Sequence, residues 1–373
     1  MERVIAPNQN GFVKGRAISN SILLASELMT FIHKARKVKT KWVLEKYASL
    51  AGQVLNKDKS TVIFSPNTPR QFKRIMASTL GAKTSNKLGK YLGVKIDSRF
   101  NSADLFNDLV EKVEFKLAGW KSRLLSQSGR LTLIKSVLQA SPIYQLSVLP
   151  MPNKYADRID ALSTNFYWGH NNNKSSIHLA PKQTLFKSRD SGGLGLHQTS
   201  LFNKALMAKQ VWRVVSQPTS VYSQWARAKY FNNNMELLPK KTTQPAAIWR
   251  CLDKSGSLIF YHLWWKIATG EQVPLGSRFW WPLQTSYPSQ HQNVAALINS
   301  ETKSWNQPLV NQLFAASVAS NILHSPLPLC NSADSYIWKF SVTGEYKVSE
   351  GYQLLSDTRH QNNPSQFFPW KFL

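Results

Sequence analysis

Acidic residues are the scarcest charged residues in this sequence. The 373 residues contain 20 Asp and Glu against 47 Lys and Arg, which gives a formal net charge of +27. Because only 18% of the residues are charged, the excess comes from missing acids rather than from an abundance of charged positions. This scarcity disfavours chemistry that needs several clustered carboxylates, such as metal-assisted phosphoryl transfer.

Other absences narrow the class of protein further. No run of about 18 apolar residues occurs, so we expect no membrane span. The first residues lack the apolar stretch of a secretory signal. The localisation stays unknown, with the nucleus or the cytoplasm expected for an expressed chain. Two cysteines, Cys251 and Cys330, are too few for a disulfide framework or a Cys-based zinc site. The eight histidines show no metal-binding spacing, so we expect no metal site.

Apolar and aromatic residues, by contrast, are plentiful. Apolar residues make up 42% of the chain and aromatic residues 12%, with 13 Trp. This is enough material for a packed core, which excludes an intrinsically disordered chain. The length is that of two or three domains.

The positive charge is unevenly distributed. Residues 1–250 carry 39 Lys and Arg against 13 Asp and Glu, whereas residues 251–373 carry 8 against 7. The sequence therefore has a basic body and a near-neutral tail. Such an excess indicates a polyanionic partner, most often nucleic acid, because each cation on a phosphate releases counterions.

The pattern of apolar residues predicts a helix-rich α+β fold. Strands are expected over residues 60–64, 91–96 and 334–341, the last followed by a turn at Gly344. Helices are expected over residues 69–80, 101–118, 129–140, 155–168, 202–215 and 222–231, and from residue 348 onward. Residues 181–196 read as a polar loop, and residues 233–333 suggest only short elements and loops.

Two clusters invite a chemical interpretation. Asp104, Asp108 and Glu111 share one helix face, but we interpret them as first-turn acids favoured by the helix dipole rather than as metal ligands. The run Gly192-Gly193-Leu194-Gly195 follows Lys182, Lys187 and Arg189. It is either a phosphate contact or, the interpretation we favour, a structural turn.

Four stretches of this chain resemble reverse transcriptases of plant non-LTR (LINE-type) retrotransposons, and a fifth resembles the start of that family's zinc-binding domain. The first contains Gln9, Lys14-Gly15-Arg16 and Asn20-Ser21, where the family usually has Asp-Asn. The others include Tyr91-Leu92-Gly93, Gly129-Arg130 and Gly192-Gly193-Leu194-Gly195. The stretches are residues 5–25, residues 51–60 with 91–94, residues 119–144, residues 166–213 and residues 334–348.

The resemblance implies an incomplete reverse-transcriptase palm remnant followed by a helical thumb and a connection region. It implies five segments. These are a fingers and palm remnant (1–42), the end of the palm with a primer-grip-like hairpin (43–101), a helical thumb and post-thumb region (102–232), a Trp-rich connection (233–333) and the truncated start of the zinc-binding-type domain (334–373).

The resemblance also implies nucleic-acid contacts, with RNA or an RNA–DNA duplex as the partner. Arginine suits this role because its planar guanidinium grips a phosphate with two donors. The implied contact residues are Gln9, Lys14, Arg16, Lys59, Lys121, Arg123, Arg130 and Lys135.

The departures from the family pattern concern catalysis. No Asp-Asp pair occurs in the chain, and only about twenty residues link Met29 to Ala51, where the family has its catalytic palm motifs. The family uses Mg²⁺, whose ligands are missing here, so we expect no cofactor and no catalytic residue. The sequence thus resembles an internally deleted, truncated and inactive polymerase. The alternative is a non-enzymatic adapter that contacts proteins through its Trp-rich C-terminal region.

Overall fold

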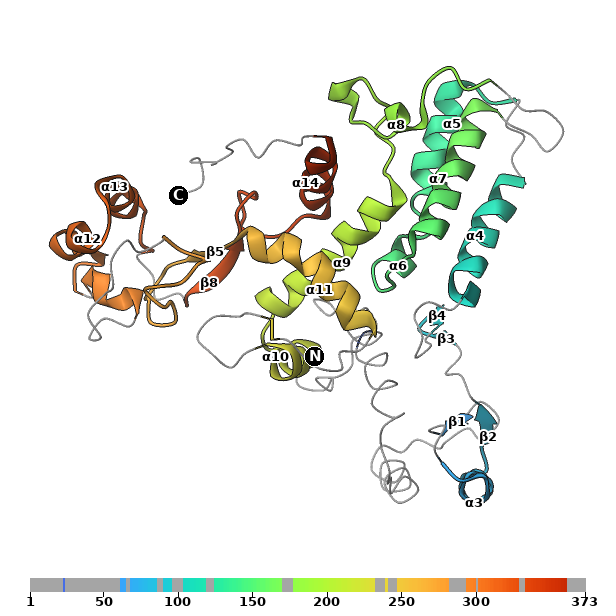
Figure 1. The fold of residues 1–373 in the computed structure, drawn as a ribbon, viewed down its shortest axis with the longest axis horizontal. Coiled ribbons are helices and arrows are strands. Elements are labelled where there is room, and N and C mark those ends of the chain that lie inside the picture. The colour runs from blue at the N-terminus through green and yellow to red at the C-terminus, as the bar shows by residue number, and fades with distance from the viewer. Residues whose placement is uncertain are drawn as a thin grey trace, which may run out of the picture. The chain divides into compact units, whose positions relative to one another are not determined.

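The described part of the chain divides into two compact units in a computed structural model (Figure 1). The N-terminal unit comprises residues 1–200 and 245–250, and the C-terminal unit residues 201–244 and 251–373. The structure describes residues 23, 61–64, 68–85, 90–95, 103–118, 124–169, 177–231, 239–240, 247–281, 293–299, 301–328 and 333–360.

Two small sheets belong to the N-terminal unit. Strand β1 (Thr61–Ile63) pairs in parallel with β2 (Lys83–Ser85), and helix α3 (Arg70–Leu80) connects them. Gly81 ends α3 in the left-handed conformation, at φ 62°, as its missing Cβ allows. Strands β3 (Lys90–Tyr91) and β4 (Val94–Lys95) form an antiparallel hairpin.

A helical bundle forms the core of the N-terminal unit (Figure 1). It consists of α4 (Ala103–Ala118), α5 (Gln127–Leu133), the π-helical segment η2 (Ile134–Leu138), α6 (Ile143–Leu146) and α7 (Asn153–Trp168). Apolar residues at helical spacing meet at its centre, among them Val113, Ile134, Leu138 and Phe166. Leu185 and Leu196, from the segment after the bundle, complete this cluster.

The segment after the bundle contains two short helices, α8 (Lys182–Leu185) and the 3-10 turn η3 (Arg189–Ser191). Helix α9 (Thr199–Ser216) then begins with a buried cap. Asp160 of α7 accepts hydrogen bonds from the backbone N and the hydroxyl of Thr199, at 3.1 and 2.6 Å. A carboxylate at this position accepts a hydrogen bond from an otherwise free helix amide and interacts favourably with the positive end of the helix dipole.

The C-terminal unit mixes helices with two small antiparallel sheets. Strand β5 (Leu263–Lys266) pairs with β8 (Ser335–Trp338), and β6 (Ile298–Asn299) pairs with β7 (Ser304–Trp305). The 3-10 turn η4 (Val294–Leu297) precedes β6. The helices are α9 from residue 201, α10 (Val221–Tyr230), α11 (Ala247–Tyr261) from residue 251, α12 (Gln307–Leu313), α13 (Ala316–His324) and α14 (Val348–His360).

The core of the C-terminal unit is aromatic. Trp338 is fully buried, with its ring edge-on to His262 at 5.6 Å and to Tyr346 at 4.9 Å between centroids. The hydroxyl of Tyr346 donates to the carbonyl of Ala205 in α9, at 2.9 Å. Offset and edge-on ring pairs of this kind stabilise a core beyond the area they bury.

Asp334 organises a second part of this unit. Its carboxylate accepts hydrogen bonds from the backbone N–H groups of residues 268, 269, 270 and 272, at 2.7 to 3.1 Å. The hydroxyl of Thr269 donates to the same carboxylate at 3.3 Å. One buried side chain therefore fixes the loop that follows β5.

The expected α+β, helix-rich class is confirmed, and most expected helices are present. The single strand expected over residues 91–96 is wrong, because the chain turns back at Leu92 and Gly93, at φ 50° and 81°. The weak elements expected over residues 233–333 are also wrong in part, since α11 has 15 residues. Within the described residues, none of the helices combines the length and apolar character that a bilayer crossing needs.

Candidate nucleic-acid interface

Lys135 lies in the π-helical segment at the centre of the bundle. The backbone N of Gln139 donates to the carbonyl of Ile134 at 2.9 Å, a bond to the fifth residue before it. Single π turns of this kind are rare and are frequent at functional sites. The Lys135 ammonium donates to the carbonyl of Leu194 at 2.6 Å, and this contact fastens the glycine-rich run to the helix.

The glycine-rich run is closed by its own backbone hydrogen bonds. The amides of Gly192, Gly193 and Gly195 donate to the carbonyls of Arg189, Ser188 and Lys187, at 2.9 to 3.0 Å. A Cβ at Gly193 would lie 2.2 Å from the carbonyl oxygen of Lys187, so the turn excludes any side chain there. A phosphate-binding loop presents free amides to its ligand. These amides are already used, which supports the structural-turn interpretation.

The turn brings three basic side chains near one another. The pKa of Lys135 is lowered, first by burial and second by the nearby charge of Arg189. His197 remains partly exposed, yet surrounding protein atoms and then the Lys135 charge lower its pKa as well. Within the described residues, no carboxylate lies within ion-pair distance of Lys135 or Arg189. We call Lys135 and Arg189 the cation cluster; His197, with its lowered pKa, lies beside them and is uncharged at neutral pH.

Arg130, on the helix that precedes η2, contacts the C-terminal end of α7. Its Nη1 donates to the carbonyl of Tyr167 at 3.1 Å. Gly169 ends α7 at φ 77°, and a Cβ there would lie 2.6 Å from Arg130 Nη1. The guanidinium thus occupies space that the glycine leaves open, and its charge complements the negative end of the helix dipole.

The structure describes two of the eight residues expected to contact nucleic acid. These are Arg130 and Lys135, which lie on the consecutive segments α5 and η2. The other six lie outside the described residues: Gln9, Lys14, Arg16, Lys59, Lys121 and Arg123. Arg189 appeared in the sequence only as a neighbour of the glycine-rich run. His197 was missed, because nothing near it in the sequence points to Lys135.

The described residues contain no group of three or more His, Cys, Asp or Glu side chains that could hold a metal ion. Asp108 instead forms an ion pair with Lys95, at 2.6 Å, which ties β4 to α4. The cation cluster has the opposite character. It is suited to electrostatic contact with an anion such as a phosphate rather than to metal-dependent chemistry.

Two proteins of Arabidopsis thaliana are similar to this chain. One, named a "putative ribonuclease H protein", is 27% identical over 297 residues, which are 74% of this chain and 47% of the relative. The other, named an "uncharacterized mitochondrial protein", is 29% identical over 150 residues, 40% of this chain and 97% of the relative. The chain thus spans about half the length of the first relative. No known family model matches the chain.

Proposed function

We propose that this chain is part of a plant LINE-type retrotransposon reverse transcriptase and that it holds an RNA–DNA duplex without copying it. Three lines of support converge. The sequence resembles the palm end, thumb and connection of that family, and a plant relative carries the name of a ribonuclease H protein. The basic excess of residues 1–250 suits a polyanionic partner.

The cation cluster is the observation that carries the proposal. An ammonium group has three donors, and the Leu194 carbonyl accepts from Lys135 without neutralising its charge. Arg189 is exposed on the same turn and offers a planar, bidentate donor set for a phosphate. Asp190 is the one acid in residues 187–197, and no described ion pair links it to these cations.

The absence of copying follows from the sequence. Templated phosphoryl transfer needs carboxylates that hold two metal ions, and the chain has no Asp-Asp pair. We therefore expect the purified chain to give no primer extension on an RNA template with Mg²⁺ or Mn²⁺. Any templated product would contradict this part of the proposal.

The adapter alternative depends on exposed tryptophans, and these are largely internal. Trp249, Trp265, Trp280 and Trp281 are each at most 6% exposed. Packed indoles of this kind stabilise the unit itself rather than present a broad apolar patch to a partner. Their burial favours the nucleic-acid proposal over the adapter.

Duplex binding by the full chain tests the proposal. Fluorescence anisotropy with a labelled RNA–DNA duplex should show an affinity that falls steeply between about 50 and 200 mM salt. Replacing Arg189 by Gln should lower the slope of log affinity against log salt by about one, the loss of one phosphate contact. Arg158→Gln is the matched control, because Glu114 already neutralises Arg158 at 2.6 Å. Salt-insensitive binding, or equal effects of the two variants, would overturn the proposal.

A further inference from the structure

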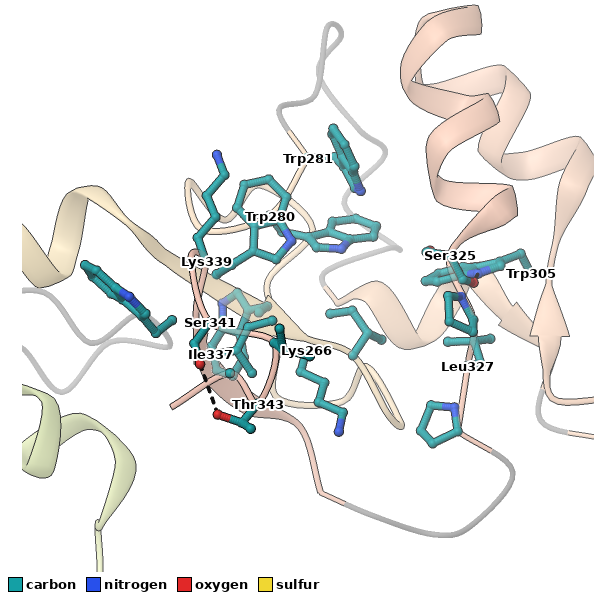
Figure 2. A pocket seen from close by; sticks show the side chains of 18 residues that line it. Lys266, Trp280, Trp281, Trp305, Ser325, Leu327, Ile337, Lys339, Ser341 and Thr343 are labelled. Carbon is teal, nitrogen blue, oxygen red and sulfur yellow. Dashed lines mark hydrogen bonds between the residues drawn. The ribbon is translucent and has the colours of Figure 1, made fainter. Parts of the chain in front are cut away.

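A cavity of about 390 Å³ lies in the C-terminal unit, within the size range of small-molecule sites. Strands β5 and β8, the residues around Trp280 and the segment after α13 line it. Figure 2 shows Trp280 and Trp281 on one side and Trp305 with Leu327 on the other. Six of the described lining residues are tryptophans: Trp264, Trp265, Trp280, Trp281, Trp305 and Trp338. We call this cavity the tryptophan pocket.

The indoles of the tryptophan pocket are held in fixed orientations. Trp280 and Trp305 lie nearly parallel, at 24°, with ring centroids 6.2 Å apart. The Nε1 of Trp305 donates to the carbonyl of Ser325 at 2.8 Å, which fixes the indole by its edge. Trp264 meets Trp281 edge-on, with centroids 5.4 Å apart. Trp264 and Trp305 are partly exposed, whereas the other four indoles of the pocket are buried.

Two lysines and no described carboxylate line the tryptophan pocket. Lys339 lies over the Trp264 ring, with its Nζ 5.3 Å from the centroid. Lys266 is exposed, and Figure 2 shows the two ammonium groups extending in opposite directions. The surrounding residues 251–373 are nearly neutral, with 8 basic and 7 acidic residues. The positive character of the pocket is therefore local and does not follow from composition.

Flat aromatic walls with cations on two sides match one kind of ligand. A nucleobase stacks on aromatic side chains whatever its sequence, while the phosphates beside it attract lysines. An apolar peptide would use the indoles but would gain nothing from the two ammonium groups.

We propose that the tryptophan pocket binds one unpaired nucleotide of a single-stranded nucleic acid, with its base against the indoles and its flanking phosphates near Lys266 and Lys339. This site is separate from the cation cluster, and it rests on the proposed function only for nucleic acid as the class of polymer.

Stacking is the first property to test. A short single-stranded oligonucleotide carrying 2-aminopurine should lose fluorescence on binding the full chain, because that base is quenched when it stacks on indole. Trp305→Ala should weaken binding about 5- to 150-fold, the range found when one stacking aromatic is removed. Trp305→Phe keeps a ring and should retain most of the affinity. Equal affinity of wild type and Trp305→Ala would overturn the proposal.

The lysines give a second test that does not disturb the aromatic packing. Lys266→Gln and Lys339→Gln should each lower the salt slope of oligonucleotide binding by about 0.7, the value for one phosphate contact on a single strand. Lys254→Gln is the matched control, because Lys254 is exposed on α11 and does not line the pocket. A slope unchanged in all three variants would count against the proposal.

The two nucleic-acid sites can fail independently. Arg189→Gln should weaken duplex binding and leave 2-aminopurine quenching unchanged, and Trp305→Ala should do the reverse. Failure of the unmodified chain to bind the duplex, with quenching of the oligonucleotide intact, would overturn the proposed function alone. A different outcome would assign the pocket to a protein ligand and overturn this inference. In it, a proline-rich peptide binds the wild-type chain but not Trp305→Ala, and the oligonucleotide shows no quenching.

Discussion

The cores of the two units are built from different kinds of side chain. In the N-terminal unit, aliphatic residues such as Val113 and Leu138 fill the bundle, and the cation cluster lies beside them. In the C-terminal unit, rings such as Trp338 and Tyr346 fill the interior, and residues 251–373 of this unit carry only 8 Lys and Arg. An aliphatic core leaves recognition to surface charge, whereas an aromatic core that opens into a pocket can itself contact a ligand.

This difference matters because a nucleic acid offers two kinds of contact. Phosphates are charged, independent of sequence and available on a duplex, whereas base faces are available only where the strand is unpaired. In our two proposals, the N-terminal unit makes the first kind of contact and the C-terminal unit the second. Three perturbations test whether the interiors of the two units differ in this way.

The largest effect is expected from Trp338→Ala. Removing a fully buried indole should lower the free energy of unfolding by about 3–5 kcal/mol. Hydrogen–deuterium exchange should show lost protection in peptides from residues 262–346 and little change over residues 127–168. Val342→Ala, at a residue that is 76% exposed, should change stability by less than about 0.5 kcal/mol. An equal loss of protection in the bundle would break the comparison.

A smaller and graded effect is expected from the two buried carboxylates. Asp334→Ala leaves four backbone N–H groups without their acceptor and should cost about 3 kcal/mol, because each unmet buried donor is unfavourable. Asp160→Ala removes two hydrogen bonds at the start of α9 and should cost about 1–2 kcal/mol.

Urea denaturation of both variants gives the free energies, and Asp334→Asn, which keeps one oxygen acceptor, should fall between wild type and Asp334→Ala. A larger loss for Asp160→Ala than for Asp334→Ala would contradict the view that Asp334 fixes more of its unit.

The smallest effect is expected from pH. Burial, and then the charge of Lys339, lowers the pKa of His262 from 6.5 to about 4. The folded chain therefore binds this proton more weakly than the unfolded chain, so stability present above pH 6.5 is lost as the pH falls toward 4. His262→Phe should flatten the stability profile in this range. Lys339→Gln should raise the His262 pKa only part of the way toward 6.5, because burial remains. NMR titration of the imidazole measures this pKa, and an unchanged pKa would exclude an effect of the Lys339 charge.

Local sequence signals predicted much of the helical framework. The helices expected over residues 69–80, 101–118 and 155–168 are present over residues 70–80, 103–118 and 153–168. The strand at residues 335–338 and the turn at Gly344 were also expected. These features depend on residues near one another in the chain, which a pattern can register.

Features that depend on distant residues were missed. Helix α11 contains Gly256, whose low helix propensity obscures the element. The glycine permits close packing, since a Cβ there would lie 3.3 Å from Val211. The turn at Leu92 also depends on a distant residue. The hydroxyl of Tyr144, 52 residues away, donates to the Leu92 carbonyl at 2.6 Å.

The same distinction between nearby and distant residues applies to the candidate site. Lys135 was named from its resemblance to a thumb position, but its contact with Leu194 joins residues 59 positions apart. The proximity of Arg189 to Lys135 likewise depends on a fold that brings the glycine-rich run back to the bundle. The types of residue could be read from the sequence, and their grouping could not.

The π turn at residues 134–138 has one more consequence, for the spacing of the chain. A wider turn takes up one extra residue, so deleting one position there would restore an ordinary α-helix and keep the flanking faces near their present alignment. Arg130, which lies on α5 and contacts the end of α7, would keep its contact, whereas Lys135 lies within the turn and would shift relative to the Leu194 carbonyl. The number of residues in this turn therefore sets the position of Lys135, independently of their identity.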